Sequence, residues 1–234
     1  MILSRLTILK NYASLFFDAL RWVGVKKGGG FLNSGALNTR YLLHLFYKKD
    51  YIFVHINKTG GSSIEKALGD TEQVHLSAYT LKNHLGTQEY NSKFKFAFVR
   101  NPYDRIVSQY HYRLQNNQTD LKSGAISFKE WVIKTYVQQD ESYYNYPAMF
   151  QSQVDWLSDP EGVLLVDFVG RFENLQKDFS TVCEKLKIAN IELPHNRKSK
   201  REKNYMEYYD DETLKIISEK FHKDFEYFGY KKQG

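Results

Sequence analysis

The 234-residue chain has room for one large domain, and 42% hydrophobic and 16% aromatic residues are enough for a substantial core. Its single cysteine, Cys183, excludes an intramolecular disulfide and a zinc site built on cysteines, and we expect it to be a buried structural thiol. The formal net charge of +6 favours an anionic partner without distinguishing nucleic acid, a membrane surface and a phosphorylated small molecule.

An amphipathic helix is predicted over residues 2–25, where apolar side chains recur at helical spacing. Charged residues interrupt this segment, so it lacks the run of roughly 20 apolar residues that a membrane-spanning helix needs. It also lacks the clean apolar core of a signal peptide. We expect the helix to pack on the domain, and a weak contact with a membrane surface is the alternative. The interrupting residues are Arg5, Lys10, Asp18 and Arg21.

Strand and helix patterns alternate from residue 51 onward. Short apolar runs predict strands over residues 51–56, 94–99 and 163–169. The remaining patterns predict helices that begin at Ser63 and Asn101 and further helices over residues 127–138, 174–187 and 211–224. This order predicts an α/β fold for residues 51–234, a P-loop-like three-layer domain with a central, largely parallel sheet flanked by helices. Residues 1–50 are expected to form an N-terminal helical extension.

The first predicted strand runs into a turn that suits an anion, residues 55–63 (HINKTGGSS). Gly60 and Gly61 let the backbone curl tightly, and the helix that follows points unpaired N–H groups at the same place. Lys58 adds a positive charge, and three hydroxyl side chains add donors. In the loop of nucleotide triphosphatases the lysine follows the glycines, whereas here it precedes them. The turn therefore predicts a phosphate or sulfate site of another kind.

A second anion site is predicted at residues 98–108 (FVRNPYDRIVS). Arg100 follows the second strand at its carboxyl end, where open parallel sheets bind ligands. Asn101 is a good N-cap and Pro102 suits the first helical position. Ser108 lies about two helical turns further, so Arg100 and Ser108 can reach one anion. Arg105 is expected to be a solvated helix residue.

Together the two turns resemble the 5′-phosphosulfate loop and the 3′-phosphate motif of sulfotransferases that use 3′-phosphoadenosine-5′-phosphosulfate (PAPS). The similarity is to the carbohydrate branch with a K-T-G-G-T-S loop, which includes bacterial enzymes and resembles the animal uronic acid 2-O-sulfotransferases. Residues 168–175 (FVGRFENL) and 224–230 (DFEYFGY) extend the resemblance to about residues 51–230. Asn57 replaces the usual proline and Ser62 the usual threonine, and neither change removes a charge or an N–H donor.

The resemblance implies in-line displacement at the sulfur of PAPS by an acceptor hydroxyl, with adenosine 3′,5′-bisphosphate as product. Lys58 would act as a catalytic residue on the bridging or sulfuryl oxygens, and Arg100 and Ser108 would bind the 3′-phosphate. Because a lysine can neutralise charge on the departing phosphate, we expect no metal. The 5′-phosphosulfate would be held by Lys58, Thr59, Gly60, Gly61, Ser62 and Ser63.

The acceptor hydroxyl needs a base, and in the uronic acid enzymes this base is a histidine between the two cofactor motifs. His75 follows an apolar step typical of a strand end and is the favoured catalytic candidate. His84 and Glu65 are the alternatives. His55 is expected to be a packed strand residue.

Several other residues have two interpretations. His111 and Tyr112 are expected to pack on their helix, with a place in the acceptor cleft as the alternative. Arg171 and the basic run at residues 197–203 either close over the nucleotide or an anionic acceptor, or lie in solvent.

Two other protein classes compete with this interpretation. A P-loop kinase or NTPase is supported by residues 163–167 (VLLVD), which resemble a magnesium-binding strand end. The reversed lysine–glycine order and the Arg100 motif oppose it. A basic module that binds RNA or a membrane fits the tyrosines and lysines at residues 198–209, but the sequence contains no nucleic-acid motif. We therefore expect PAPS and a saccharide or glycolipid acceptor as partners, and no nucleic acid.

Two N-glycosylation sequons begin at Asn57 and Asn117. A glycan on Asn57 would obstruct the predicted cofactor loop. With the absence of a signal sequence and the single cysteine, this predicts a cytoplasmic, bacterial protein, and membrane association through residues 2–25 is the alternative. A small metabolite or a peptide tyrosine is also compatible with the sequence as the acceptor. The sequence does not indicate the oligomeric state.

Overall fold

The computed structural model describes residues 46, 48–70, 75–116, 126–144, 147–194 and 204–233. The predicted helix over residues 2–25, the sequon at Asn117 and the basic run at residues 197–203 lie outside these residues.

The sheet consists of three parallel strands in the order β1-β2-β3, namely β1 (Tyr51–Val54), β2 (Phe94–Val99) and β3 (Phe168–Arg171). Tyr51 pairs with Phe94, and Val99 pairs with Arg171. Because the strands are parallel, their carboxyl ends meet at one edge of the sheet. The turn after Val54 and the turn at Arg100 both start from that edge. The predicted α/β fold with a parallel central sheet is confirmed.

The third strand is shorter than predicted and begins later. Leu164 forms only an isolated antiparallel bridge with Ser158, and the Leu165 carbonyl accepts a hydrogen bond of 3.0 Å from the hydroxyl of Tyr90. Leu164, Leu165 and Val166 pack against a hydrophobic core cluster on one side of the sheet. Their apolar side chains are therefore buried beside the sheet, and the prediction of a strand over residues 163–169 was wrong for residues 163–167.

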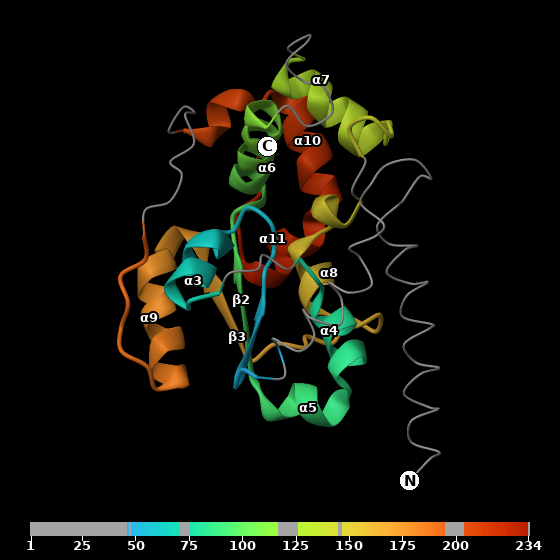
Figure 1. Ribbon diagram of the computed structural model, residues 1–234. Helices are drawn as coiled ribbons and strands as arrows, with labels where there is room; N and C mark the ends of the chain where they lie inside the picture. Colours follow the sequence, from blue (N-terminus) through green and yellow to red (C-terminus); the bar gives the residue numbers. More distant parts are fainter. Residues whose placement is uncertain are drawn as a thin grey trace.

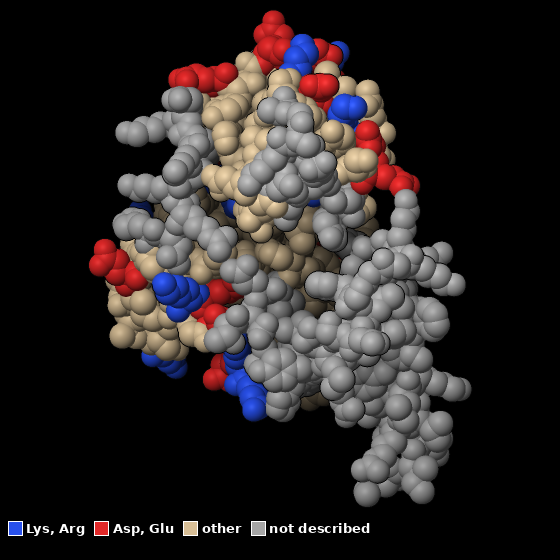
Figure 2. Space-filling view, turned by 45° about the horizontal axis from the view of Figure 1, so that its top comes forward, with Lys and Arg blue, Asp and Glu red and all other residues tan. Residues whose placement is uncertain are grey.

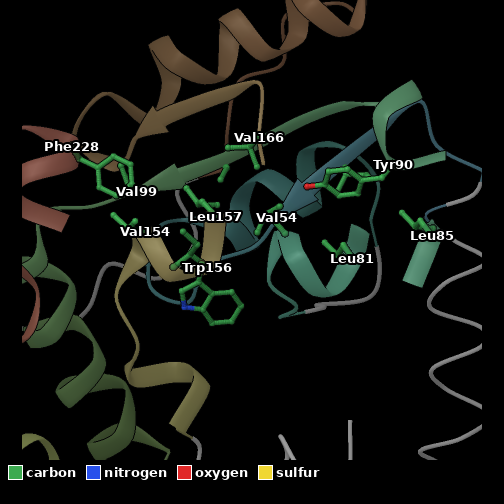
Figure 3. Close-up of a cluster of buried hydrophobic side chains, with 14 residues drawn as sticks. Val54, Leu81, Leu85, Tyr90, Val99, Val154, Trp156, Leu157, Val166 and Phe228 are labelled. Carbon is green, nitrogen blue, oxygen red and sulfur yellow. The ribbon is translucent and has the colours of Figure 1, made fainter. Parts of the chain in front are cut away.

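Helices cover both faces of the sheet, which makes the domain three-layered (Figure 1). One face carries α3 (Gly61–Ala67) and α9 (Leu175–Leu186), and the other carries α4 (Ala78–Leu85), α5 (Thr87–Ser92) and α8 (Gln153–Leu157). The alternation of strand residues explains these layers. Val54 and Val99 pack in one cluster with residues of α4 and α8 (Figure 3). Phe53 and Phe98 pack in another cluster with residues of α3 and α9. Cys183 is buried in the layer formed by α3 and α9, as predicted.

The remaining helices form the part of the molecule beyond the carboxyl ends of the strands (Figure 1). They are α6 (Pro102–Gln115), α7 (Phe128–Val132) with a π-helix (Ile133–Val137), α10 (Asp211–Lys220) and α11 (His222–Phe228). The predicted helix over residues 211–224 is thus divided at Phe221. Short 3-10 helices cover Pro147–Phe150, Phe172–Asn174 and Tyr205–Tyr208.

Ion pairs link α7 to the start of α10. Lys129 lies 2.8 Å from Asp210 and 2.7 Å from Glu212, and acidic and basic side chains lie side by side at this end of the molecule (Figure 2). Among the described helices, none is both long and apolar enough to cross a membrane.

Candidate active site

The predicted phosphate loop follows β1 and has an unusual backbone. Lys58 and Gly60 adopt positive φ angles of 69° and 87°, a region that disfavours side chains and suits glycine at the second position. The hydroxyl of Thr59 donates to the Ile56 carbonyl at 2.8 Å, and the amide of Ser63 donates to the Gly60 carbonyl at 3.0 Å. These bonds hold the loop in the sharp turn from β1 into α3.

The second glycine of the loop is required by close packing. A Cβ atom on Gly61 would overlap the imidazole of His55, with ring atoms Cδ2 and Nε2 nearest. His55 itself is buried directly after β1 and stacks on Phe53, with ring centroids 5.4 Å apart. His55 is thus a packed residue at the end of the strand, as expected, and its ring also packs directly against Gly61 of the loop.

Arg100 joins the two predicted turns. Its Nη1 donates to the Lys58 carbonyl at 3.0 Å, and its Nε and Nη2 each lie 2.7 Å from Oδ2 of Asp104. The guanidinium carbon lies 3.8 Å from the centroid of the Phe172 ring. The structure therefore brings the lysine loop and the arginine motif into contact at the carboxyl edge of the sheet.

The backbone of Arg100 is held by a glutamine that the sequence did not single out. Gln153 accepts a hydrogen bond from the Arg100 amide and donates one to the Arg100 carbonyl, both at 2.8 Å. Asp224 in turn accepts from the backbone amides of Gln153 and Val154, each at 2.9 Å. No local pattern marks Gln153, because its role depends on contacts more than fifty residues away.

Arg105 is fully buried, so the prediction of a solvated residue was wrong. Its Nη2 donates to the Asn57 side-chain oxygen at 2.7 Å and its Nε to the Asn57 carbonyl at 3.2 Å. Its Nη1 donates to the Gln151 carbonyl at 3.1 Å. A buried guanidinium is tolerated here because several oxygens satisfy its donors.

Asn57, which stands where proline is usual, thus supplies two of these oxygens. Its side chain is 7% exposed, and its amide nitrogen donates to the Met149 carbonyl at 3.1 Å. The side chain of the first sequon is therefore enclosed in the folded protein.

The side of α6 that faces the loop carries Ser108 and Tyr112. Ser108 is buried, and the ring centroid of Tyr112 lies 4.1 Å from Nζ of Lys58. Asp104, Ser108 and Tyr112 follow one another at intervals of four residues, which places them on one face of a helix. This spacing was the sequence signal that could have predicted the contact of Tyr112 with the loop. His111 instead packs against Tyr208 at 5.1 Å between ring centroids, as expected.

His75 lies beside the loop, whereas His84 does not contact it. Nδ1 of His75 lies 2.9 Å from the His55 carbonyl, and the two imidazoles are 4.3 Å apart. Nδ1 of His84 bonds to the Thr80 carbonyl within its own helix. The third candidate base, Glu65, has Oε1 2.7 Å from Nδ1 of His55.

Burial sets the charge states of this cluster. It lowers the pKa of His55 and of His75 to about 4, and nearby positive charge, including Lys58, acts in the same direction. Burial raises the pKa of Glu65 to about 7. Near neutral pH the His75 imidazole is therefore uncharged. Because a carbonyl can only accept, Nδ1 carries the proton and Nε2 carries the lone pair that a general base uses.

Arg171 and Asp167 lie at opposite ends of β3. The Arg171 guanidinium donates to the Phe228 carbonyl and lies 4.7 Å from the centroid of the Tyr230 ring. Asp167 precedes the strand and pairs with Nζ of Lys95 at 2.9 Å. The aspartate is thus at the amino end of the sheet, far from the position a magnesium-binding strand end would occupy. In the described part of the chain, no group of three or more His, Cys, Asp or Glu is placed to hold a metal ion.

Comparison with known proteins identifies relatives of the chain. A model of the sulfotransferase family matches residues 36–231. An uncharacterized protein of Archaeoglobus fulgidus is 29% identical over 112 residues, which cover 47% of this chain and 82% of that protein. No solved structure matches the chain. The family match begins before residue 51, and the boundary between extension and domain stays a prediction.

Proposed function

The chain belongs to the sulfotransferase family, and we propose that it transfers the sulfuryl group of PAPS to an acceptor hydroxyl on a saccharide or glycolipid. The observation that carries this proposal is the contact between the two cationic turns. The guanidinium of Arg100 is bonded to the backbone of Lys58, so the two positive side chains lie at one edge of the sheet. PAPS carries anionic groups at its 5′ and 3′ positions, which matches two adjacent cationic sites better than one.

In the proposed complex, Lys58 contacts the 5′-phosphosulfate and the loop from Thr59 to Ser63 surrounds it. Arg100 and Ser108 bind the 3′-phosphate, and Arg171 closes the site near the C-terminal segment. The acceptor oxygen attacks sulfur, the bond from sulfur to the bridging phosphate oxygen breaks, and Lys58 neutralises the charge on the departing phosphate. His75 accepts the hydroxyl proton at Nε2, because its Nδ1 is fixed on the His55 carbonyl. No step requires a metal.

Single-turnover transfer from ³⁵S-labelled PAPS to mixed glycans and glycolipids tests this proposal. The wild-type protein should move label to an acceptor. A His75→Ala variant should be slower by about 10²–10⁴-fold, the contribution typical of a general base. His222→Ala, at an exposed position on α11, is the matched control and should keep full activity. A wild-type protein that transfers no label would refute the function, and full turnover by His75→Ala would refute only the base.

We retain the prediction of a cytoplasmic, bacterial protein. The enclosed side chain of Asn57 supports one of its premises, namely that the first sequon carries no glycan in the folded protein.

A further inference from the structure

The side chains of two buried titratable residues next to the loop, His55 and Glu65, have no part in the mechanism above. His55 and Glu65 are 4% and 5% exposed, and Nδ1 of His55 lies 2.7 Å from Oε1 of Glu65. The second oxygen, Oε2 of Glu65, is also buried and has no hydrogen-bond partner among the described residues. Burying a carboxyl group with one oxygen unsatisfied is unfavourable, so a purely structural role explains this arrangement poorly.

The pair is connected to the proposed base. The carbonyl of His55 binds Nδ1 of His75, and the two imidazoles are in contact at 4.3 Å. The Glu65–His55 bond therefore fixes the residue whose carbonyl orients the His75 ring. The charged and titratable groups that act on Glu65 and His75 are His55, Lys58, Asp70 and Lys49.

We propose that Glu65 is a positioning residue for His75, which it orients through His55 and whose imidazolium its carboxylate stabilises during transfer. The proposal rests on the proposed function, because near neutral pH the His75 imidazolium forms only when His75 takes the acceptor proton. The proton moves from the acceptor hydroxyl to Nε2 of His75 as the oxygen–sulfur bond forms, and it later leaves to solvent. A negative charge close to this ring lowers the energy of the charged state, and the effect is larger in a buried site.

Burial makes His75 a weak base, with a pKa of about 4, and the charge of Glu65 opposes this lowering. Without the Glu65 carboxylate the imidazolium of His75 would therefore be less stable still. Because burial raises the pKa of Glu65 to about 7, the carboxylate forms as pH rises through neutrality. We therefore expect kcat to rise with pH around 7.

The test compares wild type with Glu65→Gln, which preserves size and the acceptor oxygen for His55 but removes the charge. Glu184→Gln, at an exposed position on α9, is the matched control. We expect kcat of Glu65→Gln to fall tenfold or more and the rise near pH 7 to disappear, with KM for PAPS and the affinity for adenosine 3′,5′-bisphosphate unchanged. An unchanged pH profile and rate would overturn the proposal.

A second measurement needs neither donor nor acceptor. The ¹⁵N resonances of the His75 ring should show a transition near pH 7 in the free wild-type protein, caused by ionisation of Glu65, and Glu65→Gln should lack it. Absence of the transition in wild type would overturn the coupling even if the variant failed to fold. If the transition is present but wild type does not transfer label from PAPS, the proposed function fails while the coupling stands.

Discussion

The side-chain amide of Gln153 forms two hydrogen bonds of 2.8 Å with the backbone of Arg100, one with its amide and one with its carbonyl. This pair of bonds fixes the residue that follows β2 at the carboxyl edge of the sheet. The proposed binding of the 3′-phosphate by Arg100 therefore depends on a side chain from α8.

Replacing Gln153 with leucine should weaken binding of adenosine 3′,5′-bisphosphate. The variant loses both bonds to a buried backbone, which costs about 1–3 kcal/mol per unsatisfied group. We expect the dissociation constant, measured by calorimetry, to rise about tenfold or more. Gln88→Leu, at an exposed position on α5, is the control. Equal affinity of the Gln153 variant and wild type would show that Arg100 does not need this support.

Replacing Arg105 with lysine should destabilise the fold although the charge is kept. A lysine cannot reproduce the bonds that the guanidinium makes to Asn57 and Gln151. We expect the free energy of unfolding in urea to fall by about 2–6 kcal/mol, the cost of two buried acceptors left unpaired. Lys177→Arg, on the exposed side of α9, should change it little. A stability equal to wild type would contradict the buried role of Arg105.

Replacing Gly61 with alanine should disrupt the loop. The added methyl group would overlap His55, whose ring cannot move without breaking its bond to Glu65. We expect sulfuryl transfer from PAPS to fall at least tenfold. Gly162→Ala introduces a Cβ at a positive φ of 85° with open space around it, so it should cost stability without affecting transfer. Similar activity of the two variants would argue against close packing at Gly61.

Acidification should destabilise the protein partly through His75. Its pKa is about 4 in the folded chain against 6.5 for the ordinary group, so the unfolded chain binds the extra proton as pH falls from 6.5 to 4. The stability of the folded chain is therefore unaffected by His75 above pH 6.5 and falls as the pH drops from 6.5 to 4. Between pH 7 and 5, wild type should lose about 2 kcal/mol more than His75→Gln in urea unfolding experiments. His222→Gln should behave like wild type, and a His75→Gln variant with wild-type pH dependence would contradict this prediction.

The sequence predicted the parts of the fold that local chemistry determines. Asn101 caps α6 by accepting from the Tyr103 amide, with Pro102 at the first helical position, as its residue types indicate. β2 was predicted at its observed bounds because its apolar residues face a helix layer on each side. Residues 163–166 have the same apolar character, but pairing with a neighbouring strand is a tertiary property that the pattern does not reveal.

The candidate site also has features that local sequence predicts and features that it does not. Glycines and a lysine after a strand indicate an anion loop, and the structure places Lys58 and Arg100 together as the two motifs implied. Gln153 and the burial of Arg105 could not be predicted, since both depend on residues distant in the sequence. The contact of Tyr112 with Lys58 follows from a helical spacing that was present but was assigned to packing.

The most direct test of the two-site account is calorimetric binding of adenosine 3′,5′-bisphosphate, AMP and ADP with magnesium. Adenosine 3′,5′-bisphosphate should bind at least tenfold more tightly than AMP, because only it has a 3′-phosphate for Arg100 and Ser108. Ser108→Ala should reduce this preference, and Ser92→Ala, at an exposed position on α5, should not. If AMP or ADP with magnesium binds as tightly as adenosine 3′,5′-bisphosphate, the assignment of PAPS as donor is wrong.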